Sequence, residues 1–148
     1  MIKFTLTPDV YPVTFLVLVG AWEDEEALKF MRKHGGLEKG STVEPPEFDG
    51  CMCELPSALM IWIKEVPFTP GHLSMLSHEA CHAVFAMARQ LGVGYTREAE
   101  EFHCYMNQYL IRNTLANVGK ALDKKEYDAE QAEKAAAAKP KAKAKRKR

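Results

Sequence analysis

The sequence predicts an α+β fold, and three observations support this prediction. Four short segments are rich in apolar, β-branched and aromatic residues, as strands are. Two long segments in the second half begin with helix start signals and continue for several turns. The 148 residues are 47% apolar, which is enough for one hydrophobic core. We therefore expect a small mixed β-sheet packed on the first of these helices and on a long following helix, with a disordered basic C-terminal tail.

The first half of the chain is predicted to supply the sheet and one helix. The predicted strands are residues 3–6, 11–19, 51–54 and 58–64. The apolar stretch within 11–19 has the length of a signal-peptide core, but Asp9 and Pro12 inside such a leader favour a strand. A helix is predicted over 23–34, because its acidic start suits the positive end of the helix dipole and a glycine pair follows it.

The two long helices of the second half each begin at a capping threonine. Thr69 can cap a helix whose first residue is Pro70, where the missing N–H costs nothing. This helix should end near Gln90. Thr96 is the second cap, and the helix that follows it should continue past Gly119, where a glycine permits a kink.

Charge is distributed unevenly along the chain. Residues 139–148 carry seven basic side chains and no acidic one, which leaves residues 1–138 with 13 basic against 20 acidic. We expect a domain over 1–122 and, over 123–148, a charged helical extension followed by a disordered Lys/Ala-rich tail. Clustered Lys and Arg favour non-specific contact of 139–148 with nucleic acid, and a solvated tail is the open alternative. No stretch is long and apolar enough for a membrane helix, so we expect no membrane contact.

The motif His78-Glu79-Ala80-Cys81-His82 lies in the middle of the first long helix. Helical positions four apart share one face, so both imidazoles can bind one ion. Glu79 is rotated about 100° from His78, so its carboxylate can reach a water molecule on the ion without binding the metal. Burying three ionisable groups without partners costs several kcal/mol, and a metal removes that cost. The motif therefore predicts a zinc site with Glu79 as general base.

A third zinc ligand is expected from the second long helix, because a helix-turn-helix brings its first turns back beside the histidines. Eighteen residues separate His82 from Glu101, which is our first candidate. Glu98 shares a helix face with Glu101 and is the alternative ligand, whereas Glu100 points elsewhere.

The zinc motif followed by Glu101 at this spacing resembles the gluzincin metallopeptidases. The segment 67–110 is similar to small uncharacterised zincin-like proteins of phages and bacteria. The resemblance implies a zinc-dependent hydrolase in which His78, His82 and Glu101 bind Zn²⁺.

The resemblance also raises expectations about the oxyanion and the substrate. Hydrolysis needs a hydrogen-bond donor to the oxyanion, and the candidate is Tyr105, one turn beyond Glu101. The alternative is that Tyr105 is a buried tyrosine of the core. In zincins a strand before the metal helix lies along the cleft and pairs with extended substrate. Residues 58–64 could have that role or could form a central strand of the core.

The four cysteines are expected to be reduced thiols, since a core of this size needs no disulfides. Cys51 and Cys53 are too closely spaced for a usual zinc knuckle, and we interpret them as two small apolar residues on a strand. Cys81 and Cys104 flank the proposed ligands and are expected to pack between helices rather than to bind metal.

Two functions of different classes follow from these features. The leading hypothesis is a cytoplasmic zinc metallopeptidase, in the host cytoplasm if phage-encoded, that acts on proteins or peptides. The alternative is a non-catalytic zinc-containing protein that acts through its basic tail on nucleic acid or acidic partners. An intact Glu79 favours the first, because a structural zinc site needs no base. The short chain favours the second, because little of it is left to build specificity pockets.

Overall fold

A computed structural model describes residues 1–138 and confirms the predicted α+β fold. The predicted basic tail, 139–148, lies outside the described residues. The elements are β1 (Ile2–Leu6), β2 (Phe15–Val19), α1 (Asp24–His34), β3 (Gly50–Leu55), β4 (Ala58–Ile63), α2 (Pro70–Gln90), a short 3₁₀ turn (Arg97–Ala99) and α3 (Glu100–Ala138). Met1–Val118 forms one compact unit, and the chain from Gly119 on belongs to a second. The predicted domain end at 122 falls inside α3, just past this division.

The described strands form one mixed sheet in the order β1-β2-β4-β3. β1 and β2 are antiparallel, β2 and β4 are parallel, and β4 and β3 are antiparallel. All residues of β2 and β4 are buried, because each strand has a neighbour on both sides and helices on both faces. The two most apolar segments of the sequence thus become the centre of the sheet.

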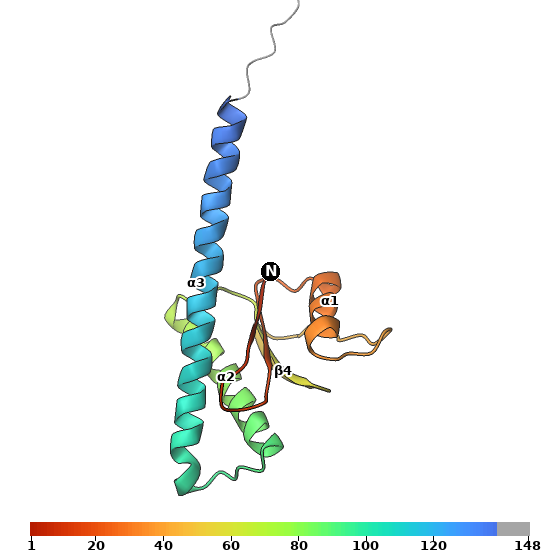
Figure 1. The fold of residues 1–148 in the computed structure, drawn as a ribbon, viewed down its shortest axis with the longest axis vertical. Coiled ribbons are helices and arrows are strands. Elements are labelled where there is room, and N and C mark those ends of the chain that lie inside the picture. Colours follow the sequence, from red (N-terminus) through yellow and green to blue (C-terminus); the bar gives the residue numbers. More distant parts are fainter. Residues whose placement is uncertain (139–148) are drawn as a thin grey trace, which may run out of the picture. The chain divides into compact units, whose positions relative to one another are not determined.

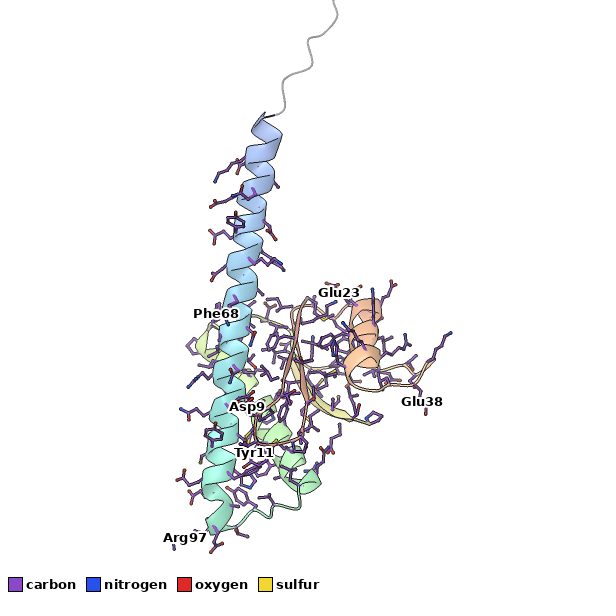
Figure 2. All side chains as sticks on the ribbon, in the orientation of Figure 1. Asp9, Tyr11, Glu23, Glu38, Phe68 and Arg97 are labelled. Atoms are coloured by element: carbon purple, nitrogen blue, oxygen red, sulfur yellow. The ribbon has the colours of Figure 1, made fainter. Side chains whose placement is uncertain are left out.

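The strand predicted over 11–19 is shorter than expected, because its first residues form a turn. The N–H of Tyr11 donates to the carbonyl of Pro8 (3.3 Å), and the N–H of Val13 donates to that of Tyr11 (2.8 Å). The β2 strand therefore begins only at Phe15. The turn lies beside α3 (Figure 2), where the Tyr11 ring meets the edge of Phe102 with centroids 5.2 Å apart.

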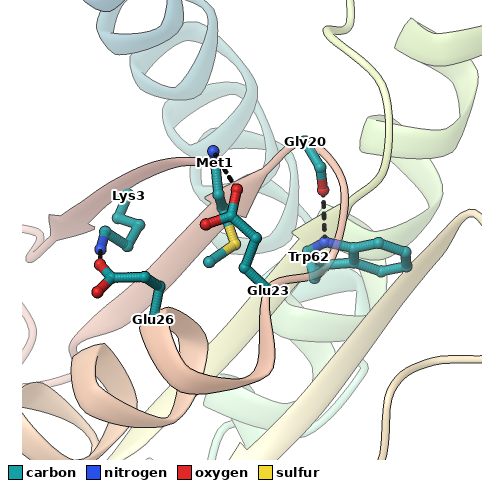
Figure 3. A network of polar contacts seen from close by, with 6 residues as sticks. All are labelled: Met1, Lys3, Gly20, Glu23, Glu26 and Trp62. Atoms are coloured by element: carbon teal, nitrogen blue, oxygen red, sulfur yellow. Dashed lines mark hydrogen bonds and ion pairs between the residues drawn. The ribbon is translucent and has the colours of Figure 1, made fainter.

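Helix α1 covers one face of the sheet. Its buried Ala27 and Met31 join a cluster with alternate residues of the central strands: Leu16, Leu18, Ala58, Met60 and Trp62. Polar contacts hold α1 and the segment before it on the sheet (Figure 3). Lys3 of β1 pairs with Glu26 of α1, and the Trp62 indole N–H donates to the carbonyl of Gly20, just after β2 (3.0 Å). The residues of β2 and β4 that alternate with this cluster face the opposite side.

Helix α2 lies on the opposite side of the sheet from α1 (Figure 1), against β3 and β4. It begins as predicted, since the Thr69 hydroxyl accepts from the backbone N–H of His72 (3.3 Å). Thr96, the second predicted cap, makes no such bond, and a 3₁₀ turn precedes α3 instead. Helix α3 is continuous through Gly119.

Beyond the compact unit the described part of α3 has no buried side. Every side chain from Asp123 to Lys134 is exposed, because this part of the helix has no apolar stripe to pack against other elements. Within the described residues, no helix is long and apolar enough to cross a membrane.

Candidate functional site

The two histidines of the motif meet on the exposed side of α2. His78 and His82 lie one turn apart, with their Nε2 atoms at 3.0 Å and their rings edge to face. Two imidazole nitrogens bound to one tetrahedral zinc ion, each at about 2.05 Å, lie about 3.3 Å apart. The helix therefore holds the pair close to the separation that shared coordination requires.

Glu79 points the other way, towards the sheet. Its side chain is 6% exposed and lies over the start of β3, where a Cβ on Gly50 would come within 3.3 Å of its Cγ. The sheet can approach the helix so closely because Gly50 has no side chain. The glycine at position 50 thus leaves the space that the Glu79 side chain needs.

An open hollow of about 410 Å³ connects the histidine side of α2 with the edge of the sheet. His78 and Glu79 line it together with the apolar side chains of Phe48 and Met75. Phe48 is 73% exposed although it is a large aromatic residue. Sequence reasoning missed Phe48, Gly50 and Met75. Phe48 and Gly50 lie in or next to a segment without a helical or strand pattern, and Met75 looks like any other apolar residue of a helix.

The strand beside this hollow is β3, which is paired only with β4 in the described part of the chain. Residues 58–64 had two possible roles, and β4 proves to be one of the two central strands, with all six residues buried. A strand buried on both faces and paired on both sides offers no free edge to a substrate. If a strand lines the cleft, it is the edge strand that starts at Gly50.

Glu101 lies apart from the histidine pair. Helices α2 and α3 run in opposite directions (Figure 1), and His103 faces Phe85 with ring centroids 5.4 Å apart. By helical rise, Glu101 is then offset along the axis by roughly 13 Å from His78 and roughly 7 Å from His82. Within residues 1–138, no group of three or more His, Cys, Asp or Glu side chains is placed to hold a metal ion. Coordination by Glu101 stays a prediction, and it requires α3 to shift along α2.

Glu98, the alternative ligand, is exposed in the 3₁₀ turn. Its carboxylate accepts hydrogen bonds from its own backbone N–H and from the Thr96 side chain, and these bonds lower its pKa. The Glu98 carboxylate is thus hydrogen-bonded within the turn itself and does not contact the histidines.

Tyr105 also lies apart from Glu79. Its side chain is 58% exposed, which excludes the core position that was its alternative. It lines a separate hollow on α3 with Tyr109 and Arg112. Burial, then the charges of Asp9 and Tyr105, raise the pKa of Tyr109. A role for Tyr105 at the oxyanion stays a prediction.

His103 occupies a small cavity of about 170 Å³ where α2 and α3 meet. It is 8% exposed, and neither ring nitrogen has a hydrogen-bond partner among the described residues. Cys81 and Cys104 line the same cavity. Cys81 is half-buried there, whereas Cys104 is exposed rather than packed between helices as expected. No sequence pattern distinguished this histidine from a solvent-exposed one.

Comparison with known proteins supplies no relative for this chain. No family model, no curated protein and no solved structure matches it. The functional argument therefore depends on the motif and its geometry.

Proposed function

We propose that this chain is a zinc-dependent metallopeptidase that hydrolyses peptide bonds in the cytoplasm. The observation that carries the proposal is the helical turn that holds two imidazole nitrogens 3.0 Å apart, beside a hollow that His78 and Glu79 both line. His78 and His82 would hold the ion, and Glu101 is the proposed third ligand. Zinc in this place supplies a Lewis acid that polarises a carbonyl and lowers the pKa of water to about 7.

The remaining chemistry belongs to the side chains around the hollow. Glu79 takes the proton of the attacking water and passes it to the leaving amine. Its position against the sheet keeps it away from the metal-binding face, so it remains a base rather than a ligand. Phe48 and Met75 provide apolar walls for a substrate side chain. The outer edge of β3, which no strand of residues 1–138 covers, can pair with an extended peptide.

The test combines metal content with cleavage of an unfolded protein such as casein. We expect bound zinc in the wild type and in Glu79→Gln, and loss of zinc in His82→Ala. Only the wild type should cleave. His34→Ala, which removes a histidine from α1, is the matched control and should keep both properties. Absence of zinc from the wild type would contradict the proposal.

The alternative function is a zinc-containing binding protein that acts through residues 139–148. The charge difference between this segment and the acidic remainder favours it. It predicts zinc in the wild type without cleavage, and retention on nucleic acid at low salt that is lost when 139–148 are deleted. Under the peptidase proposal the same deletion leaves cleavage unchanged.

A further inference from the structure

Two thiols lie side by side on the edge strand. Cys51 and Cys53 are two positions apart on β3, so their side chains share the face that packs beside the α1 cluster. Their Sγ atoms are 3.9 Å apart and form a hydrogen bond. Both are free and half-buried. The sequence suggested two small apolar residues, but the strand brings the two reactive atoms into contact.

The contact makes the two sulfurs chemically different. The hydrogen bond from Cys51 lowers the pKa of Cys53 to about 7, although burial and the charge of Glu79 oppose this effect. The same hydrogen bond, together with burial, raises the pKa of Cys51. Near neutral pH, a substantial share of Cys53 is therefore thiolate, while Cys51 keeps its proton.

We propose that Cys51 and Cys53 form a redox-active dithiol that reacts with low-molecular-weight disulfides of the glutathione class. The Cys53 thiolate attacks one sulfur of the disulfide, which forms a mixed disulfide and releases one thiolate that takes up a proton. Cys51 then loses its proton and attacks the Cys53 sulfur, which releases the second small thiol. One small disulfide is reduced to two thiols, and the two protein thiols are oxidised to one disulfide.

The strand geometry determines how easily this disulfide is reduced again. Residues two apart on an extended strand have Cα atoms about 6.7 Å apart, near the upper limit for a disulfide. The sulfurs must approach from 3.9 Å, so β3 has to bend where it pairs with Met60 and Trp62. The oxidised pair is therefore strained, and we expect dithiol reductants to reverse it quickly.

The test uses the full-length protein incubated with oxidised glutathione at pH 7, quenched with acid and analysed by intact mass and peptide mapping. We expect the wild type to lose two hydrogens between Cys51 and Cys53 without retaining glutathione. Cys51→Ser retains a hydrogen-bond donor beside Cys53 but has no thiol to resolve the adduct, so it should accumulate glutathione on Cys53. In Cys51→Ala the adduct forms about fivefold more slowly, because the Cys53 pKa returns towards that of an ordinary thiol.

The other two cysteines supply the control. The double variant Cys81→Ser, Cys104→Ser removes the remaining thiols and should behave as the wild type does. Circular dichroism of each variant before oxidation shows that it is folded. A wild type that keeps a stable glutathione adduct, or a Cys53 that reacts no faster than Cys81 and Cys104, would overturn the proposal. Neither outcome depends on zinc or on peptide cleavage.

Discussion

Strands β3 and β4 are hydrogen-bonded neighbours of equal length, yet they serve different purposes. β4 is buried along its whole length and joins β2 to β3. β3 is half-exposed and carries Gly50 under Glu79 and the thiols of Cys51 and Cys53. The fold depends on the buried strand β4, whereas the groups of the proposed chemistry lie on or beside β3, the edge strand of the described sheet. Substitutions in the two strands should therefore have separable effects.

The largest effect is expected from truncating the centre of β4. Ile61 is fully buried and pairs with Val17 on one side and Met52 on the other. Ile61→Ala should lower the free energy of unfolding by about 2–5 kcal/mol, because it leaves a cavity between two layers. Its neighbour on β3 is the control: Met52→Ala should cost about 1–2 kcal/mol, since that side chain is only half-buried.

Denaturant unfolding followed by circular dichroism measures both values. Equal losses for the two variants would mean that β3 contributes to the core as much as β4 does, and the comparison between the strands would fail.

The next effect concerns the approach of α2 to β3. A Cβ on Gly50 would meet the Met75 side chain at 2.7 Å and the Glu79 side chain at 3.3 Å. Gly50→Ala should therefore destabilise the protein by about 1–3 kcal/mol through overpacking. It should also reduce cleavage under the proposed function while zinc content stays the same, because it displaces the base and not the histidines.

Gly71 provides the matched control, because it lines the same hollow. A Cβ there meets nothing within 4 Å, and Gly71 lies in the first turn of α2. Gly71→Ala should be neutral or stabilising by up to about 1 kcal/mol. Similar losses of unfolding free energy in both variants would show that the close packing of α2 on β3 does not depend on glycine at position 50.

Much of this fold could be predicted from local signals. The Thr69 cap, Pro70 and the β-branched strands gave the element types, because these signals act within a few residues. The predicted start of β2 was four residues too early. The short turn around Tyr11 is held by single backbone hydrogen bonds and leaves no periodic pattern in the sequence. The helical spacing of His78 and His82 was also readable, since it depends on one helix only.

The rest of the site depends on contacts between distant segments, which no local signal determines. The place of Glu101 depends on the axial position of α3 relative to α2, which is decided by the contacts between the two helices, such as His103 against Phe85. Likewise, Gly50 and Glu79 meet only because β3 is an edge strand under α2, and strand order cannot be derived from periodicity.

A smaller effect, on a rate, should distinguish the paired thiols of β3 from ordinary ones. Because the hydrogen bond from Cys51 lowers the pKa of Cys53 to about 7, alkylation of Cys53 by iodoacetamide should rise with pH and reach half its maximum near pH 7. In Cys51→Ala this midpoint should move upward by more than one pH unit, towards about 8.5. Peptide mapping at each pH identifies the modified residue. An unchanged midpoint in Cys51→Ala would contradict the assigned cause of the lowered pKa.

The smallest effect is expected at the exposed end of β3, where Glu54 pairs with Arg89 of α2. Both side chains are largely exposed, so water and salt screen their attraction. Glu54→Gln should change the free energy of unfolding by no more than about 0.5 kcal/mol, and by less at high salt. A loss above 1 kcal/mol in denaturant unfolding at two salt concentrations would assign the edge strand a share in holding α2. In that case stability and chemistry would not be divided between β4 and β3.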